Sequence, residues 1–156
     1  MKLVVQRVTR ASVAINNKVH NSINSGLLVL CGIETNDGEE DIDYLVNKLT
    51  NLRIFSDDDN DFNNSILDIT GEILLISQFT LLANTRKGRR PSWDLAANSD
   101  IAKPIYNLLL DKLQNQSLIV KDGVFGSDMQ IELVNDGPVT IIIDSKDRLA
   151  SRKQLS

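Results

Sequence analysis

The chain has 156 residues, a formal net charge of −4 and 42 % hydrophobic residues, a composition typical of one globular domain and not of disordered, collagen-like or coiled-coil proteins. Its acidic balance argues against broad nonspecific binding to nucleic acid. The apolar runs fall far short of the roughly 20 residues that a membrane helix needs, and the N-terminus lacks the layout of a signal peptide. We therefore expect a cytoplasmic protein without a membrane segment.

One cysteine and one histidine exclude several kinds of site. A single cysteine cannot form an internal disulfide bond, and the pair cannot supply a zinc site, so any metal would need carboxylate ligands alone. His20 lies in a polar stretch typical of an exposed loop, and Cys31 lies in an apolar run typical of a buried, unreactive thiol. We expect no metal and no other cofactor. An ordinary Ser-His-Asp or Cys-His arrangement is also disfavoured.

The first half of the chain predicts strands around one helix. Residues 2–15 alternate in polarity, which predicts a strand with a break or turn, and the apolar run 26–33 predicts a strand buried on both faces. Asn36-Asp37-Gly38 precedes apolar residues at helical spacing, which predicts a helix. That helix would pack by one stripe, which consists of Ile42, Leu45, Val46 and Leu49.

Between this helix and the next, we expect two segments that belong to the sheet. Residues 53–55 are predicted to re-enter it, the Asp- and Asn-rich residues 56–64 form a loop by composition, and residues 72–78 predict another strand. A long polar connection then leads to Ser99-Asp100, which we expect to cap a second helix with Pro104 in its first turn. Its apolar face would consist of Ile101, Ile105, Leu108, Leu109 and Leu113.

The last third predicts three strands, over residues 117–121, 124–134 and 139–143, with a turn at 135–138. We predict one α/β domain over residues 1–144, with a mixed, strongly curved, barrel-like sheet flanked by two main helices. Residues 145–156 carry no sustained pattern and are expected to form a frayed tail.

Two segments are candidates for chemistry. In Ser77-Gln78-Phe79-Thr80-Leu81, polar groups follow an apolar strand at the end where ligands of α/β sheets bind, and local N–H groups there could hold an oxyanion. The alternative is a polar strand end that ties down a turn. Asn135-Asp136-Gly137-Pro138-Val139-Thr140 is either a tight turn or a rigid device with a cis Gly-Pro bond.

A third candidate is a cluster of positive charge. Four basic residues fall within five positions of an otherwise acidic chain, which is the pattern expected where a protein holds a phosphate backbone at one place. A solvated loop is the alternative. The cluster consists of Arg86, Lys87, Arg89 and Arg90.

Taken together, the two polar segments resemble the signature pair of D-aminoacyl-tRNA deacylases. Other segments resemble the family in the same order, so that the resemblance runs from residue 1 to about residue 144. These segments are residues 6–8, 11–13, 26–29, 51–55, 87–92 and 125–126, with Met129. Departures are small: Trp93 stands where phenylalanine is expected, and Ser127 where alanine is expected.

The resemblance implies a homodimeric hydrolase that cuts the ester between a D-amino acid and the 3′-terminal ribose of tRNA and that also acts on glycyl-tRNA. Gly137 and Pro138 would form a cis pair that enters the pocket of the partner subunit. There an L side chain would meet their carbonyl groups, whereas a D side chain points away and glycine has nothing to clash. Selection would therefore act by exclusion.

The resemblance also implies roles for the first segment. Ser77, Gln78, Phe79 and Thr80 would line the pocket, with the main-chain N–H groups of Phe79 and Thr80 holding the scissile carbonyl oxygen. Thr80 is the only candidate protein nucleophile by position, but the motif contains no histidine to activate it. We therefore favour substrate-assisted hydrolysis, in which the ribose 2′-hydroxyl helps to position or activate water.

Further residues would bind tRNA or support the site. Phe125 and Met129 either shape an adenosine pocket, with Phe125 stacked on the base, or belong to the core. Arg7 would fix the Gly-Pro loop through hydrogen bonds to its backbone. The four residues of the basic cluster would contact tRNA phosphates. Two rival functions remain, a noncatalytic RNA-binding module and a hydrolase of small free esters or amides.

Overall fold

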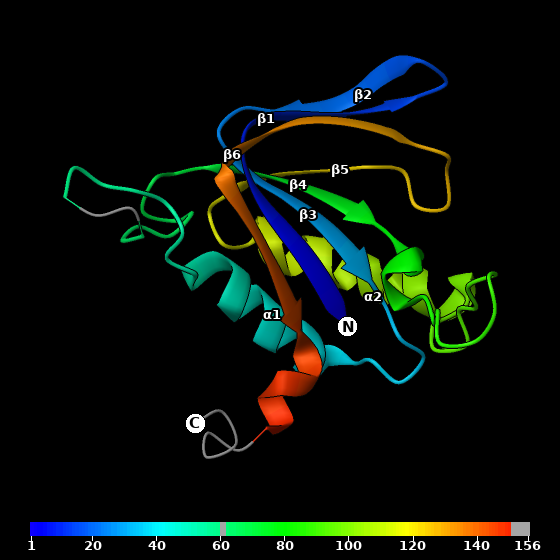
Figure 1. The fold of residues 1–156 in the computed structure, drawn as a ribbon. Coiled ribbons are helices and arrows are strands. Elements are labelled where there is room, and N and C mark those ends of the chain that lie inside the picture. Colours follow the sequence, from blue (N-terminus) through cyan, green and yellow to red (C-terminus); the bar gives the residue numbers. More distant parts are fainter. Residues whose placement is uncertain (60–61, 151–156) are drawn as a thin grey trace.

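A single long strand organises the sheet. In the computed structural model, which describes residues 1–59 and 62–150, strand β1 (Lys2–Ile15) belongs to a six-stranded, strongly curved sheet that resembles an open barrel (Figure 1). Along one edge, β1 pairs antiparallel with β3 (Gly26–Gly32) through its first half and with β2 (Lys18–Ile23) through its second half. Along the other edge it pairs with β6 (Gln130–Asp144) over nearly its whole length.

The parallel part of the sheet lies beyond β3. Strand β4 (Glu72–Ser77) pairs parallel with β3, and β5 (Ile119–Asp122) pairs parallel with β4. Gly26 permits the first pairing, because a Cβ atom there would lie 1.9 Å from the carbonyl oxygen of Glu72. Side chains close the curve, since Asn21 Nδ2 donates to the carbonyl of Asp122 at 2.7 Å and Lys121 Nζ to that of Ser22 at 2.6 Å. The predicted curved, mixed sheet is thereby confirmed.

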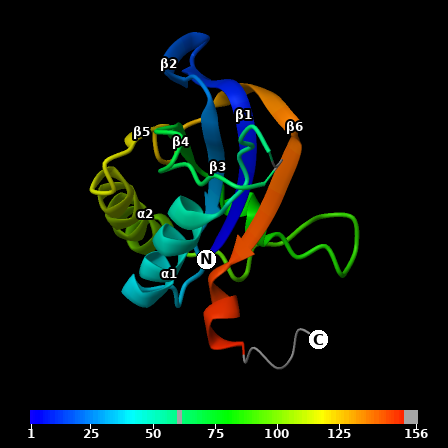
Figure 2. The same ribbon diagram turned by 90° about the vertical axis from the view of Figure 1, so that its left-hand side faces the viewer.

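Two helices cover one face of the sheet, as predicted (Figure 2). Helix α1 (Glu39–Asn51) follows Gly38, whose N–H donates to Asp41 Oδ2 at 3.0 Å, and all four residues of its predicted stripe are buried. The second helix, α2 (Ser99–Gln114), packs beside α1. No helix among the described residues is long and apolar enough to span a membrane.

Helix α2 differs from its prediction in three details. Its cap is Asn98, whose Oδ1 accepts a hydrogen bond from Ile101 N at 3.2 Å, and Pro104 is its sixth residue, beyond the first turn. The buried face is also rotated, because the Tyr106 hydroxyl reaches into the core and donates to Leu75 O at 2.8 Å. The buried residues are Ala102, Tyr106, Leu109 and Leu113, whereas the predicted Ile101 and Leu108 are more than a third exposed.

Residues 53–55 do not re-enter the sheet, contrary to the prediction. The apolar side chains of Ile54 and Phe55 are buried in the core without joining a strand. Phe55 forms only an isolated bridge with Asn64. This bridge closes the predicted loop 56–64, of which residues 60 and 61 lie outside the described part of the chain.

The C-terminal third contains two strands where three were predicted. Residues 124–129 form no strand, and β6 runs from residue 130 to residue 144 without a separating turn. Residues Ser145–Leu149 then form the short helix η2, in which Ser145 is fully buried and Arg148 pairs with Glu40 and Asp41 of α1. The expectation of a frayed tail is therefore wrong for residues 145–149, because these contacts hold them. Residues 151–156 of that tail lie outside the described residues.

Candidate functional site

A cavity of about 610 Å³ lies where the parallel strands end. Cys31 at the end of β3 and Ser77 at the end of β4 form its floor, and the N-terminal turn of α2 forms one side. Residues 125–129, the segment before β6, form another side. We call this space the strand-end cavity. Its place agrees with the expectation that ligands bind beyond the carboxyl ends of parallel strands.

The structure brings three residues of the first motif to this cavity. Ser77, Gln78 and Phe79 line it, and the N–H of Gln78 donates to the carbonyl of Cys31 at 2.7 Å, which holds the end of β4 against β3. Thr80 is exposed and does not line the cavity, but its hydroxyl accepts a hydrogen bond from Gln78 Nε2. Thr80 is therefore oriented by a residue of the cavity wall.

The short helix η1 (Phe79–Leu82) begins at this motif. The first N–H groups of a helix have no partner within the helix, and here they belong to Phe79 and Thr80. Such groups are donors for a negatively charged oxygen, since they are fixed in direction and need no reorganisation. The local backbone can thus supply the oxyanion site that the motif predicts.

Phe125 and Met129, the predicted base-binding residues, also line the strand-end cavity. The Phe125 ring additionally packs on Tyr106 of α2, with centroids 5.6 Å apart and planes inclined at 55°. The two alternatives for Phe125 are therefore compatible, because one ring face is supported by the core while the residue forms part of the cavity wall.

The described residues that line the cavity include no histidine, and Asp128 is the one carboxylate among them. His20 is exposed on β2 and lines neither of the two cavities discussed here, and Cys31 is 2 % exposed. Burial raises the pKa of the Cys31 thiol to about 12, which keeps it protonated and unreactive at neutral pH. The described residues contain no cluster of ligands that could hold a metal ion. His20 and Cys31 are therefore not candidates for activating water at this site.

The second motif forms an excursion within β6 and not a turn between two strands. Gln6 of β1 pairs with Thr140, and Val8 pairs with Asn135, so that two steps along β1 correspond to five along β6. Residues 136–139 lie opposite the single residue Arg7, three residues more than β1 supplies, and bulge out of the pairing; we call them the Gly-Pro loop. Gly137 adopts a φ of 115°, which favours glycine, and its peptide bond to Pro138 is cis.

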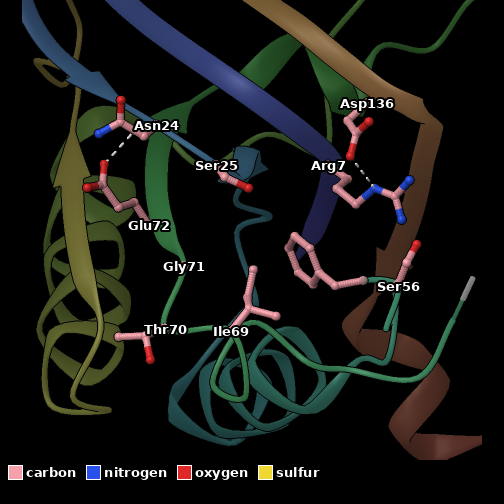
Figure 3. Close-up of a pocket in the computed structure, with 10 residues that line it drawn as sticks. Arg7, Asn24, Ser25, Ser56, Ile69, Thr70, Gly71, Glu72 and Asp136 are labelled. Carbon is pink, nitrogen blue, oxygen red and sulfur yellow. Dashed lines mark hydrogen bonds and ion pairs between the residues drawn. The ribbon is translucent and has the colours of Figure 1, made fainter. Parts of the chain in front are cut away.

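Asn135 and Arg7 hold the Gly-Pro loop, and Figure 3 shows Arg7 paired with Asp136 of this loop. Asn135 Nδ2 donates to the carbonyl oxygens of Arg7, at 2.9 Å, and Val139, at 3.0 Å, which joins the two ends of the loop. Arg7 is buried, donates from Nη1 to Ile54 O at 2.6 Å, and has its Nε 3.0 Å from Asp136 Oδ2. Arg7 thus contacts a side chain of the loop, whereas hydrogen bonds to its backbone were predicted. The clamping role of Asn135 was missed, although asparagine before an irregular segment is a usable signal.

The Arg7–Asp136 ion pair borders a second cavity, of about 500 Å³. Figure 3 shows the pair facing this space, with Asn24 and Glu72 on the other side of it. Asn24 N donates to Glu72 Oε2 at 2.9 Å, so this wall is also internally bonded.

Within one chain, the two motifs lie at opposite ends of the parallel strands. Arg7 pairs with Leu27 near the start of β3, whereas Cys31 near its end lines the strand-end cavity. Four residues of strand separate these positions by about 13 Å. Neither Gly137 nor Pro138 lines the strand-end cavity of its own chain.

The basic cluster lies in an exposed loop beside the strand-end cavity. Backbone hydrogen bonds between Asn84 and Ser92, at 2.7 and 3.1 Å, close this loop, which we call the basic loop. Its four cations are exposed, and none of them forms an ion pair with another described residue. Trp93 follows the loop and packs edge-on against Phe79, with centroids 5.6 Å apart, so the loop adjoins the cavity mouth. These cations are available to an anionic partner.

Comparisons with known proteins agree on one family. Residues 4–144 match the D-Tyr-tRNA(Tyr) deacylase family. A protein of Finegoldia magna named D-aminoacyl-tRNA deacylase is 55 % identical over 146 residues, which cover 94 % of this chain and 99 % of that protein. A protein of the same name from Azobacteroides pseudotrichonymphae is 52 % identical over 149 residues, covering 95 % and 99 %.

Solved structures share the fold. One described as a c-Myc DNA unwinding element binding protein superposes with a TM-score of 0.87 at 41 % identity, covering 92 % of this chain and 98 % of that chain. A probable eukaryotic D-amino acid tRNA deacylase gives a TM-score of 0.78 at 16 % identity, covering 91 % and 97 %, and so supports the fold alone.

The burial of Cys31 predicts its chemical behaviour. At pH 8 a thiol with a pKa of about 12 is ionised to about one part in 10⁴. We expect Ellman's reagent to label the native protein at least ~100-fold more slowly than the protein in denaturant, where the pKa returns to about 8.5. The variant Ser22→Cys, which adds an exposed thiol on β2, is the control for reagent activity. Fast stoichiometric labelling of the native wild type would show that the thiol is accessible and ionised.

Proposed function

Because this chain belongs to the D-Tyr-tRNA(Tyr) deacylase family, we propose that it hydrolyses the ester between a D-amino acid, or glycine, and the 3′-terminal ribose of tRNA. The observation that carries this proposal is the match to curated D-aminoacyl-tRNA deacylases at 52 to 55 % identity over almost the whole chain. The products are free amino acid and tRNA, so the protein acts in translation quality control, in the cytoplasm.

The strand-end cavity is the proposed substrate site. Its volume of about 610 Å³ lies within the range of about 300–1,000 Å³ that is usual for small-molecule pockets. Phe125 and Met129 would contact the terminal adenosine, with Phe125 supported from behind by Tyr106. The aminoacyl group would then extend toward Ser77, Gln78 and Phe79. This placement brings the scissile carbonyl to the start of η1.

The proposed chemistry uses backbone polarity and the substrate's own hydroxyl. The N–H groups of Phe79 and Thr80 would stabilise the carbonyl oxygen as water adds to the carbonyl carbon. The ester C–O bond then breaks, and the departing 3′-oxygen of the ribose takes up the proton that the attacking water has lost. The adjacent 2′-hydroxyl is our candidate for positioning or activating the water, since the cavity wall offers no histidine. Thr80, bonded to Gln78, would orient the substrate and not attack it.

A homodimer would complete this site. The Gly-Pro loop does not reach the strand-end cavity of its own chain, whereas a second copy could supply the loop across an interface. Strand β6 is an edge strand with exposed apolar side chains: Val134 is 37 % exposed and Ile142 is 71 % exposed. Such a face suits burial against another copy. In the dimer, Gly137 and Pro138 would exclude an L side chain and leave room for a D side chain or for glycine.

The basic loop would hold the tRNA backbone. Its four cations, which form no ion pair with another described residue, lie beside the cavity, and neutralising phosphates there releases counterions, which makes binding salt-dependent. A noncatalytic RNA-binding module would use the same loop. Ester turnover, and not nucleic-acid binding, therefore discriminates between the two functions.

Chiral hydrolysis is the direct test of the function. We expect the wild-type protein, in the presence of a chelator, to release tyrosine from D-tyrosyl-tRNA on the order of 100-fold or more faster than from L-tyrosyl-tRNA. The measurement is loss of radiolabelled amino acid from tRNA. Binding of tRNA without loss of either ester would favour the RNA-binding module.

The variant Gly137→Ala connects selection to the Gly-Pro loop in the same assay. A Cβ atom at this position would lie 2.8 Å from Val139 Cγ2 and 2.9 Å from Arg7 Nη2, and φ is positive, so the loop must shift. We expect the ratio of D to L cleavage to fall. The matched control is Gly38→Ala, whose Cβ atom would have no neighbour within 4 Å. An unchanged ratio in Gly137→Ala would remove the loop from chiral selection.

Removing the Thr80 hydroxyl separates orientation from nucleophilic attack. In the variant Thr80→Ala we expect kcat on D-tyrosyl-tRNA to fall by no more than about 10³-fold, the upper value for loss of one hydrogen bond that stabilises the transition state. Loss of a nucleophile typically costs about 10⁴-fold or more. Ser22→Ala removes an exposed hydroxyl on β2 and serves as the control. A trapped acyl-threonine, or complete inactivity with intact folding, would contradict the substrate-assisted route.

Salt dependence tests the basic loop. In Arg89→Gln, the slope of log Kd for tRNA against log salt concentration should decrease by about 0.7 to 0.9, the value for one lost phosphate contact. Lys18→Gln removes an exposed charge on β2 and should leave the slope unchanged. Equal slopes in wild type and Arg89→Gln would mean that Arg89 is solvated in the complex. Filter binding between 50 and 200 mM salt, roughly the range over which such contacts weaken, gives the slopes.

A further inference from the structure

Two aromatic rings lie exposed at the mouth of the strand-end cavity. Phe79 is 56 % exposed and Trp93 is 38 % exposed, and the rings meet edge to face with centroids 5.6 Å apart. Phe79 lines the cavity, whereas Trp93 does not, so Trp93 lies one ring further out. Large aromatic side chains that remain in contact with water side by side indicate a binding surface.

The backbone around Trp93 is held in place on both sides. Before it, the bridge between Asn84 and Ser92 closes the basic loop. After it, Ala96 N donates to Trp93 O at 3.0 Å, and Ala97 N donates to Ile33 O at 2.9 Å, which fastens the segment to the end of β3. The indole is therefore presented from a fixed backbone, and little side-chain freedom is lost when a flat ligand stacks on it.

The charges beside Trp93 identify the class of ligand. The basic loop ends directly before Trp93, and its four cations have no acidic partner among the described residues. Exposed aromatic rings combined with unpaired cations are how proteins bind single-stranded nucleic acid, with bases stacked on the rings and phosphates on the cations. A second copy of this chain, with a net charge of −4, would also be attracted to these cations. It would not, however, offer flat bases for the rings together with a row of phosphates for the cations.

We propose that Trp93 is a stacking platform for an unpaired nucleobase of the tRNA 3′ end, next to the terminal adenosine in the strand-end cavity. This inference rests on the proposed function, because it assumes that the terminal adenosine occupies that cavity. Trp93 is then a positioning residue: it contacts the substrate away from the ester and determines how the 3′ end enters. Stacking is tolerant of sequence, so this contact serves tRNAs of any amino acid.

Fluorescence gives a direct readout, because Trp93 is the only tryptophan in the chain. The probe is a stem-loop RNA that carries no amino acid and has a single-stranded 3′ end, and it is titrated into the full-length protein. We expect the emission of Trp93 to be quenched on binding. The same RNA with an abasic nucleotide in the penultimate position should quench less and bind about 5-fold or more weakly, since the stacked base is missing.

Kinetics supply the second readout. In Trp93→Ala, KM for D-tyrosyl-tRNA should rise about 5-fold or more with kcat nearly unchanged, whereas D-tyrosyl-adenosine, which lacks the neighbouring nucleotide, should be cleaved as by wild type. Trp93→Phe keeps an aromatic face and should restore most of the affinity. Leu95→Ala removes a neighbouring side chain that is 57 % exposed and should leave both substrates unaffected.

Each other outcome has a defined meaning. Hydrolysis of the D ester without quenching, or an equal loss on the tRNA and adenosine substrates in Trp93→Ala, would overturn the stacking role and leave the proposed function intact. A change of oligomeric state in Trp93→Ala, measured by sedimentation, would also overturn it, because the ring would then belong to an interface between copies. Failure of the wild type to cleave any D ester would instead overturn the proposed function.

Discussion

The pairing of β1 along both of its edges is the constraint on which the site depends. One edge of β1 holds β3, and through it the parallel strands whose ends form the strand-end cavity. The other edge holds β6, whose excess residues between Asn135 and Thr140 must bulge out of the pairing as the Gly-Pro loop. Since one strand sets both registers, the loop and the cavity are held at a fixed separation. A one-residue slip would exchange the two faces of a strand and displace both.

Polar groups in this fold are placed so that the backbone carries the chemistry. The end of β4 is fastened to β3 by Gln78 N, and η1 starts directly after it with free N–H groups, while the nearby Cys31 is kept protonated by burial. Backbone N–H groups of this kind can stabilise charge on a substrate oxygen. In the proposed reaction such a site would act on an activated ester whose neighbouring hydroxyl takes part.

The acidic body of the protein differs in charge from the basic loop next to Trp93. The body is acidic, with several of its carboxylates paired to Lys112, Lys146 and Arg148, whereas the cations of the basic loop, next to Trp93, have no ion pair within the part of the chain that the structure describes. Opposite charge on the body and on one loop favours a single orientation for a polyanion.

The sequence by itself determined the elements whose pattern is local. Strand β3, the buried stripe of α1, the unreactive Cys31 and the two polar motifs follow from spacing and composition. Only tertiary structure decided which apolar residues enter the sheet: Phe55 is buried without joining it, and Tyr106 turns α2 because its hydroxyl finds a carbonyl of β4. It also decided that the Gly-Pro segment is an excursion within one strand, because that depends on pairing with β1, far away in sequence. Side-chain partners such as those of Asn135 are set by the same distant pairing and leave no local pattern.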